Sequence, residues 1–436
     1  MFFLTFILYL CGTKHIVPPL RVCHYTLEYS PESMKGPYTM SEDIFKNTIP
    51  VAPLKLAVMP SCAHLGDSVD RYISNLRNER THNHESSLAL KGYYEDSYKV
   101  DVSCPRFGSG EAKGVIGSSV RGSDFFIMTD VMNHSLTYTV TGHTNHMSPD
   151  DHFQDLKRII SAAACSAKRI TVIMPFLYES RQHKRNKLES LDSSLALNEL
   201  IQYGVSNIIT FDAHDPRIDN SIPLNGFDNF LPPYQFIRAL LSHNKDIIID
   251  KEHLMVISPD EGAMPRAVYF AGVLGVDMGM FYKRRDYSQV VNGRNPIVAH
   301  EFLGDNVAGK DVIIIDDMIS SGESMLDTAR ELKERKANRV FICTTFGLFT
   351  DGLDKFDKYY DMGCFNGVVT TNLTYRTPEL LGKPYYYEAD MSSFLGTIID
   401  YLNHDISIGG IMDPTEKIQF LLDEYNKKQE KEFKPA

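Results

Sequence analysis

Residues 311–324 decide the fold, and they read DVIIIDDMISSGES. The apolar run over Asp311–Ile315 predicts a buried strand, which Asp316 and Asp317 follow at its carboxyl end. Apolar residues at helical spacing then predict the buried face of a helix: Met325, Leu326, Ala329 and Leu332. Because a helix N-terminus presents unpaired backbone N–H groups, the turn before it can bind a phosphate monoester. The residues of this turn are therefore candidates for a phosphate site: Ser320, Ser321, Gly322, Glu323 and Ser324.

The two carboxylates beside that turn indicate a sugar phosphate. Asp316 and Asp317 can accept hydrogen bonds from sugar hydroxyls next to the bound phosphate. The alternative is an ordinary helix N-cap preceded by two polar residues. We favour the sugar phosphate site, because a cap does not require two carboxylates directly after a run of apolar residues.

Short apolar strands alternate with amphipathic stretches along most of the chain, which predicts parallel sheets covered by helices. The predicted strands are Leu54–Met59, Asp124–Thr129, Arg169–Met174, Asn207–Phe211, Leu254–Ile257, Asp311–Ile315, Arg339–Thr344 and Gly367–Thr371. A helix is predicted after the first strand, and Ser148 is expected to cap another. The break at Leu231, Pro232 and Pro233 indicates a boundary between two α/β halves.

Composition narrows the class of protein. The chain has 436 residues, is 43% apolar and carries a net charge of −11. It is therefore long and apolar enough for two or three domains with real cores, and a disordered chain is excluded. An acidic balance argues against nucleic-acid and anionic-membrane partners. The seven scattered cysteines contain no Cys-x-x-Cys pair, so we expect reduced thiols and a cytoplasmic location.

The first ten residues, MFFLTFILYL, are apolar but too short to span a bilayer. They lack a basic segment before the apolar run, and no clear cleavage site follows before Lys14. A signal peptide core is one interpretation. We favour the other, in which translation begins at Met40 and residues 1–39 are an extension outside the core.

Other polar segments carry side chains suited to nucleotides and metal ions. Arg181 offers a planar fork and Gln182 an amide for adenine or phosphate, although a solvated basic loop is the alternative. Asp212 and His214 follow a predicted strand and can reach a metal or a phosphate, whereas a lone histidine is more often structural. Asp260 is a hard oxygen ligand suited to Mg2+.

Two further segments carry no cofactor expectation. The histidine-rich stretch 142–152 precedes a proline turn and has no sulfur partner, so a polar loop leading into the Ser148 cap explains His143 and His146 better than a metal. The glycines at 108, 110 and 114 lack the spacing of a dinucleotide-binding motif.

Taken together, the motifs resemble those of the ribose-phosphate diphosphokinases, also called phosphoribosyl diphosphate synthetases. Residues 311–324 resemble the phosphoribosyl diphosphate motif of the type I phosphoribosyltransferase fold, and residues 258–267 resemble the family's diphosphate loop. Residues 178–185 resemble its ATP-binding Arg-Gln segment, and residues 211–214 its metal-binding strand end. Residues 283–285 resemble the start of its mobile catalytic loop. The likeness runs in the family's order over about residues 54–405.

The resemblance implies an α/β fold of two phosphoribosyltransferase-like, Rossmann-like domains with parallel sheets flanked by helices. The implied domains are an N-terminal domain with ATP-binding segments over 52–232, a ribose-phosphate domain over 233–375, and a C-terminal segment with a charged helical tail over 376–436.

The implied reaction transfers the diphosphoryl group of ATP to the anomeric hydroxyl of ribose 5-phosphate and yields phosphoribosyl diphosphate and AMP. The resemblance implies Mg2+ near His214, Asp260 and Asp212, with Lys283 and Arg285 as the catalytic cations. It also implies that Arg181, Gln182, Phe107 and Glu111 bind ATP. In the family the hairpin of the last two residues reaches a neighbouring subunit's site, so a homo-oligomer with shared sites is implied.

Several positions depart from the family pattern. Ser109 and Ser320 each replace an aspartate, and Glu323 replaces a glycine inside the phosphate loop. The Glu323 carboxylate is expected to point away from the phosphate, because repulsion would weaken sugar-phosphate affinity. The segment between Arg285 and Asp316 is longer than the family norm.

These departures keep a non-catalytic regulatory homologue as one alternative function. A phosphoribosyltransferase that consumes the diphosphate sugar is the other. The Arg181-Gln182 and 283–285 segments argue against the second alternative, since such a transferase has no ATP to hold. Retention of Lys283, Arg285, His214 and Asp260 favours the enzyme over the first.

Overall fold

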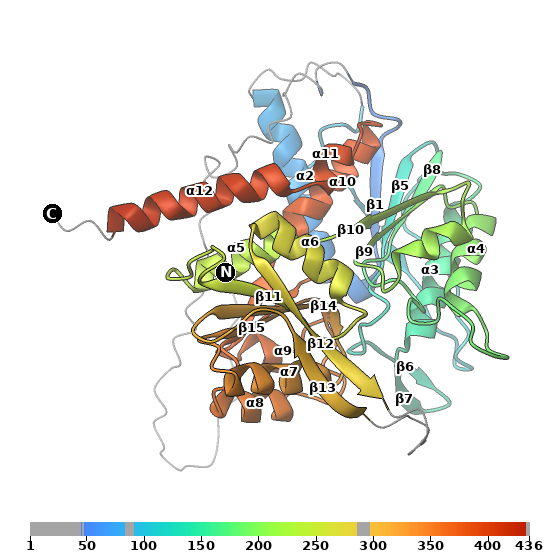
Figure 1. Cartoon of the computed structure of the whole chain (residues 1–436). Helices are drawn as coiled ribbons and strands as arrows, with labels where there is room; N and C mark the ends of the chain where they lie inside the picture. Colours follow the sequence, from blue (N-terminus) through green and yellow to red (C-terminus); the bar gives the residue numbers. More distant parts are fainter. Residues whose placement is uncertain (1–44, 46–47, 83–90, 286–296, 433–436) are drawn as a thin grey trace, which may run out of the picture. The chain divides into compact units, whose positions relative to one another are not determined.

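A computed structural model describes residue 45 and residues 48–82, 91–285 and 297–432 (Figure 1). Within them, one sheet has six strands, all parallel, in the order β10-β9-β8-β5-β1-β2. Its strands are β1 (Leu54–Val58), β2 (Lys99–Val100), β5 (Asp124–Met128), β8 (Arg169–Ile173), β9 (Asn207–Phe211) and β10 (Gly226–Phe230). β5 is buried along its whole length, as a central strand covered on both faces should be.

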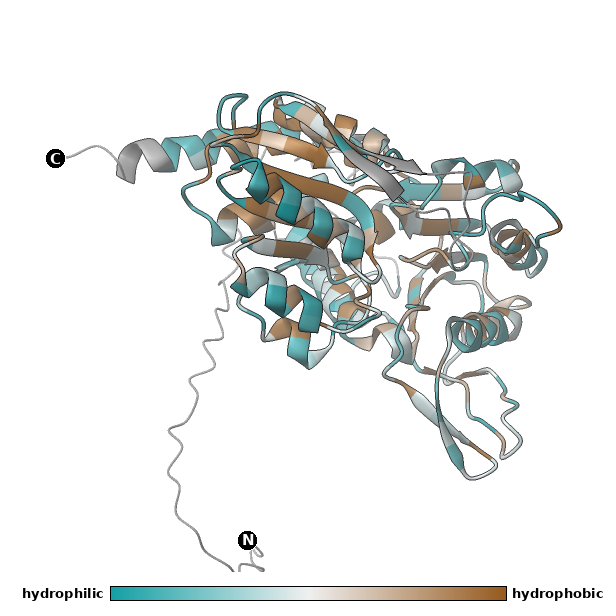
Figure 2. Ribbon diagram, turned by 60° about the horizontal axis from the view of Figure 1, so that its bottom comes forward, coloured by the Kyte–Doolittle hydropathy of each residue, from teal (hydrophilic) through white to brown (hydrophobic). Residues whose placement is uncertain are grey.

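A second sheet has seven strands in the order β13-β12-β11-β14-β15-β16-β17. Only the edge pair of β12 and β13 is antiparallel. Its strands are β11 (Leu254–Ser258), β12 (Asp277–Arg285), β13 (Ile297–Leu303), β14 (Asp311–Ile319), β15 (Val340–Gly347), β16 (Gly367–Thr371) and β17 (Tyr386–Ala389). The prediction of an α/β fold with parallel sheets is confirmed, and Figure 2 shows the apolar colouring of the central strands.

Helices cover these sheets because their apolar faces must be buried. In the first half they are α2 (Ala63–His82), α3 (Pro149–Ala163), α4 (Asp192–Gln202) and two 3-10 turns, η2 (Pro60–Cys62) and η3 (Pro216–Ser221). In the second half they are α5 (Pro233–His243), α6 (Met264–Leu274), α7 (Glu323–Glu334), α8 (Asp354–Asp361), α9 (Pro378–Leu381), α10 (Ser392–Asn403), α11 (Gly409–Met412) and α12 (Thr415–Glu432). Among the helices of the described residues, none is both long and apolar enough to cross a membrane.

The segment before α3 differs from the expected polar loop. It forms a two-stranded antiparallel hairpin of β6 (Thr137–Val140) and β7 (His143–His146), whose two histidines are exposed. A second small pair joins β3 (Val102–Ser103) to β4 (Val115–Ile116). The predicted Ser148 cap of α3 is confirmed as a capping box with Asp151.

Helix α10, near the C-terminus, packs against α2, which lies more than 300 positions earlier in the sequence (Figure 1). Arg77, of which 1% is exposed, donates from Nε to the fully buried Asp400 at 2.8 Å. Arg80 donates to the other oxygen of Asp400 at 2.5 Å, and Arg77 also bonds Asn403. Burial alone would raise the pKa of Asp400, but these two guanidinium charges lower it far below its usual value.

A second contact between the two halves involves Asp130, which follows β5 in the sequence. Asp130 is buried and accepts from the backbone N–H of Tyr375 at 2.7 Å and of Met132 at 2.9 Å. Burial raises the pKa of Asp130 to about 7, although both backbone hydrogen bonds oppose that rise. The carboxyl group is therefore positioned at a junction between distant segments and titrates near neutral pH.

Candidate functional site

The phosphate loop has the predicted strand-turn-helix form, with one difference. β14 does not end at Ile315, because its pairing with β15 continues through Asp316, Met318 and Ile319. Asp316 and Asp317 therefore lie within the last part of the strand. The turn of Ser320, Ser321 and Gly322 then leads into α7, which begins at Glu323.

Gly322 is required at this turn for two reasons. Its φ angle is +82°, in the left-handed region that disfavours side chains. A Cβ there would also lie 2.4 Å from the ring of Phe356. The backbone around it is held from both sides, since the carbonyl of Ser320 accepts from Thr350 and that of Gly322 from Leu326. The loop is thus positioned by backbone bonds that leave its hydroxyl side chains to other partners.

Glu323 points to a partner outside the loop. Its carboxylate pairs with Nζ of Lys355 at 2.7 Å on α8. Two-thirds of the Glu323 side chain is exposed, so the pair lies at the surface. The ammonium group of Lys355 therefore compensates the negative charge of Glu323 beside the candidate phosphate site.

Asp317 joins the two sheets. It is 3% exposed, and its Oδ2 lies 2.7 Å from Nδ1 of His214, which follows β9 in the other sheet. Nη2 of Arg266, on α6, lies 3.7 Å from the same oxygen. The carboxyl ends of strands from both sheets therefore meet at one carboxylate, which is where ligands bind in open α/β sheets.

Asp212 holds Arg266 in place. Its Oδ1 accepts from Nε of Arg266 at 2.6 Å, and its Oδ2 accepts from Oγ1 of Thr345 at 2.7 Å. Both oxygens of this buried carboxylate therefore have protein partners, and they fix the position of Arg266. Asp212 also has a φ of +41°, a strained backbone of the kind that clusters at functional sites.

The neighbouring carboxylates Asp316 and Asp317 have opposite pKa shifts. Burial raises the pKa of Asp316 well above its usual value, and the charges of Asp317 and Asp260 raise it further. Burial also opposes ionisation of Asp317, but the His214 hydrogen bond and the Arg266 charge lower its pKa on balance. The two adjacent carboxyl groups therefore differ in their tendency to ionise, and Asp317 is the more acidic of the two.

Asp260 lies in the turn between β11 and α6. Its Oδ1 accepts from the backbone N–H of Gly262 at 3.0 Å and of Ala263 at 3.2 Å, which fixes the turn. Its charge also contributes to the raised pKa of Asp316, after burial and the charge of Asp317. Among the described residues, no group of three or more histidine, cysteine, aspartate and glutamate side chains could hold a metal by itself.

The Arg181 segment reaches this site from the first half of the chain. Nη2 of Arg181 donates to Sδ of Met318, next to Asp317, at 2.8 Å. Gln182 uses its amide N–H groups within its own loop, on the carbonyls of Lys184 and Ser190. Arg181, which the sequence predicts to bind adenine or phosphate, therefore lies against β14, although 137 positions separate it from Met318.

The Phe107 hairpin makes its contacts elsewhere. The backbone N–H of Phe107 donates to the carbonyl of Glu111, and Ser109 donates to the Glu111 carboxylate at 2.8 Å. Phe107 is 53% exposed at the tip. The hairpin is held by α3 and by β6–β7, not by Asp317 or His214.

Lys283 and Arg285 lie in the backbone of β12, opposite His300 and Ile297 of β13. The expected start of a mobile loop is thus the end of an edge strand. Their side chains fall outside the described residues, and so do residues 286–296 of the segment that follows.

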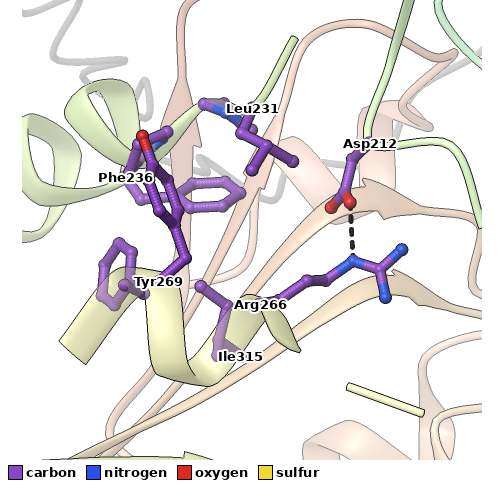
Figure 3. Close-up of a pocket in the computed structure, with 9 residues that line it drawn as sticks. Asp212, Leu231, Phe236, Arg266, Tyr269 and Ile315 are labelled. Carbon is purple, nitrogen blue, oxygen red and sulfur yellow. Dashed lines mark hydrogen bonds and ion pairs between the residues drawn. The ribbon is translucent and has the colours of Figure 1, made fainter. Parts of the chain in front are cut away.

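Sequence reasoning did not identify Arg266 and Thr345 as site residues. A signal was present for the first, since Arg266 is a single charge in the apolar helix MPRAVYFAGVL. Figure 3 shows Arg266 and Asp212 at one side of a pocket whose other labelled side chains, Leu231, Phe236, Tyr269 and Ile315, are largely apolar. Thr345 gave no signal, because it is one of several small residues in a fully buried strand.

The comparisons with known proteins agree with this geometry. Residues 235–374 match the phosphoribosyl transferase domain, so the sheet that carries the loop belongs to a domain of the phosphoribosyltransferase type. Residues 55–204 match the N-terminal domain of ribose phosphate pyrophosphokinase. The chain belongs to the ribose-phosphate pyrophosphokinase family, and the resemblance stated from its motifs is confirmed.

Curated relatives carry that name. The protein from Thermosipho africanus is 30% identical over 275 residues, which cover 62% of this chain and 78% of the relative. The one from Corynebacterium efficiens is 32% identical over 248 residues, covering 56% and 69%. The crystal structure of phosphoribosylpyrophosphate synthetase from Mycobacterium smegmatis aligns over 81% of this chain and 99% of its own, with a TM-score of 0.62 at 21% identity. That alignment confirms the fold.

Proposed function

We propose that this chain is a ribose-phosphate diphosphokinase, which transfers the diphosphoryl group of ATP to the anomeric hydroxyl of ribose 5-phosphate. The proposal rests on one observation: the carboxylate of Asp317, in β14, contacts both His214 and Arg266. The anomeric oxygen forms a bond to the β-phosphorus, and the bond from that phosphorus to the α–β bridging oxygen breaks. AMP leaves with that oxygen, and the proton of the attacking hydroxyl passes to solvent water.

Ribose 5-phosphate binds at the N-terminus of α7. The turn of Ser320–Ser324 supplies backbone N–H groups and hydroxyls to the 5-phosphate. Asp317 and Asp316 accept hydrogen bonds from the ring hydroxyls, and the lowered pKa of Asp317 favours its carboxylate form. Both ends of the sugar are then fixed, which orients its anomeric oxygen for in-line attack.

The residues present fit Mg2+. Nδ1 of His214 is bound to the Asp317 carboxylate, which fixes the ring and directs Nε2 away from it, as in many metal-bound histidines. Asp260 offers a carboxylate on the same site, and Mg2+ needs only one or two protein ligands beside substrate phosphates and water. His214 and Asp260 would hold the ion, which would neutralise charge on the triphosphate.

ATP is held by groups from several segments. Arg181 binds phosphate or adenine next to Met318, and the carbonyl oxygen of Gln182 accepts from the nucleotide. Lys283 and Arg285 stabilise the charge that builds up during transfer. Phe107 stacks on adenine and Glu111 accepts from it, in the site of a neighbouring subunit of a homo-oligomer.

The enzyme works in the cytoplasm. Support comes from the cysteines of the described residues, which are all free: Cys62, Cys104, Cys165, Cys343 and Cys364.

Phosphorus NMR of the purified chain with ATP, Mg2+ and ribose 5-phosphate tests the proposal directly. AMP and the 1-diphosphate are expected to appear only when metal is present. If both substrates bind in calorimetry but remain unchanged, the chain is a regulatory homologue and not the enzyme. A metal-free sample is the control.

A further inference from the structure

The β6–β7 hairpin has a tight two-residue turn of Thr141 and Gly142. Their φ angles are +50° and +81°, as the type I′ turns of two-residue hairpins require. Glycine adopts such angles freely, but they are strained for a β-branched residue such as Thr141. A strained turn persists only where its surroundings fix it.

The surroundings of this turn are the Phe107 hairpin, residues 106–112. The backbone N–H of Thr141 donates to the carbonyl of Gly108 at 3.2 Å. Val140 covers Gly110, since a Cβ at Gly110 would lie 2.9 Å from Cγ2 of Val140. The strained end of one hairpin is therefore bound to the tip of the other, on both sides of Ser109.

The base of the Phe107 hairpin is held by the same structure. The guanidinium of Arg106 makes a bidentate pair with Asp155 on α3, at 2.9 and 3.0 Å. It also lies 4.8 Å from the ring centroid of Tyr138, over its face. The hydroxyl of Tyr138 donates at 3.2 Å to Asp151, the partner of Ser148 in the capping box of α3.

Alternation along β6 separates the residues that touch the Phe107 hairpin from those that do not. Tyr138 and Val140 lie on one face and are half-buried, whereas Thr137 and Thr139 lie on the other face and are exposed. Thr139 is therefore a matched control, because it shares the strand but not the contacts.

The first turn of α3 also supports the Arg181 segment. Asp150 accepts from the hydroxyl of Tyr178 at 2.6 Å, and the Tyr178 ring stacks on Phe153 with 4.3 Å between centroids. Tyr178 lies three positions before Arg181. One helix end thus contacts both segments that the proposed function assigns to ATP.

We infer that the β6–β7 hairpin positions the Phe107 hairpin for nucleotide binding, with Tyr138 and Val140 as its positioning residues. The inference rests on the proposed function for the adenine role of Phe107 and Glu111. The ligand class concerned is an adenine nucleotide, and ribose 5-phosphate is unaffected because Ser320–Ser324 belong to other elements.

Steady-state kinetics of Tyr138→Ala and Val140→Ala test the inference. Each variant is expected to raise the KM for ATP about tenfold, the change that loss of one cation–π contact or one packed face produces in a binding constant. The KM for ribose 5-phosphate should stay at the wild-type value. Tyr138→Phe keeps the ring over Arg106 and should restore the KM for ATP, and Thr139→Ala should match the wild type.

Calorimetric titration with ATP separates this inference from the proposed function. If the wild type binds ATP but makes no product, weaker ATP binding in Val140→Ala still supports the hairpin's role. Wild-type ATP affinity in Val140→Ala would overturn it, as would an equal rise in both KM values. If Tyr138→Ala does not fold, Val140→Ala alone decides the question. A wild type that binds no adenine nucleotide would overturn both proposals.

Discussion

His214 and Asp317 are 103 positions apart in the sequence, yet Nδ1 of the first lies 2.7 Å from Oδ2 of the second. This contact joins the end of β9 in the six-stranded sheet to β14 in the seven-stranded sheet. The proposed metal-binding side chain and the proposed sugar-binding side chain are therefore oriented by each other. A change at either should affect both ligands.

Asp317→Ala tests that coupling. The substitution removes the acceptor for a ring hydroxyl and the partner of His214, so the KM for ribose 5-phosphate should rise about tenfold or more. The concentration of Mg2+ that gives half-maximal rate should rise with it. Asp327→Ala on α7, whose side chain is exposed and pairs with Arg330, is the control and should change neither value. Normal affinity for both ligands in Asp317→Ala would contradict the proposed site.

Lys283→Ala tests the catalytic cation. If Lys283 stabilises charge only during transfer, turnover should fall about 10²–10³-fold while calorimetric affinity for ribose 5-phosphate stays constant. Lys251→Ala removes an exposed lysine before β11 of the same sheet and should leave turnover unchanged. Turnover that survives the loss of Lys283 would remove this residue from the mechanism.

Lys355→Ala tests the charge balance beside the phosphate loop. Without its partner, the Glu323 carboxylate repels a phosphate at the α7 N-terminus, so the KM for ribose 5-phosphate should rise about two- to fivefold, most at low salt. Glu323→Gln should not raise it, and the double variant should return to the wild-type value. Lys358→Ala, also exposed on α8, is the control. A double variant as weak as Lys355→Ala would disprove the repulsion.

Asp130→Asn tests the raised pKa of the buried carboxyl group that follows β5. The pKa of Asp130 is about 7 in the folded chain, so between about pH 4 and pH 7 the unfolded chain binds fewer protons than the folded one. Wild-type stability relative to the variant should therefore fall as pH rises through this window, by up to about 1.4 kcal/mol per pH unit, and level off above it. Urea unfolding midpoints from pH 4.5 to 8.5 measure this difference. Parallel curves for the two proteins would show that Asp130 does not titrate near neutrality.

The main strands were predictable because they are buried and pair in parallel with their neighbours. Such strands appear as continuous apolar runs between turns, and Asn207–Phe211 and Gly367–Thr371 have the predicted bounds. Short edge strands such as β2 and β17 were not predicted, because two to four residues are too few to form a recognisable apolar run. The extension of β14 through Asp316 and Asp317 was also not predictable, since carboxylates normally mark the end of a strand.

The candidate site was predictable in its parts but not in its connections. The sequence identified Asp317, His214 and Arg181 separately, because each follows an apolar run or stands in a recognisable segment. It could not show that Asp212 is used by Arg266 and Thr345, because those partners come from distant elements. The stretch 142–152 was expected to be a polar loop because β7 within it, HTNH, is exposed throughout and has no apolar residue.

The ion pairs of Asp400 with Arg77 and Arg80 have a consequence for synthesis of the chain. Both guanidinium groups belong to α2 near the start, and the carboxylate that compensates them is made more than 300 residues later. Burying them without it would cost about 3–5 kcal/mol. We therefore expect the two arginines of α2 to stay accessible to water in a nascent chain until α10 has been translated.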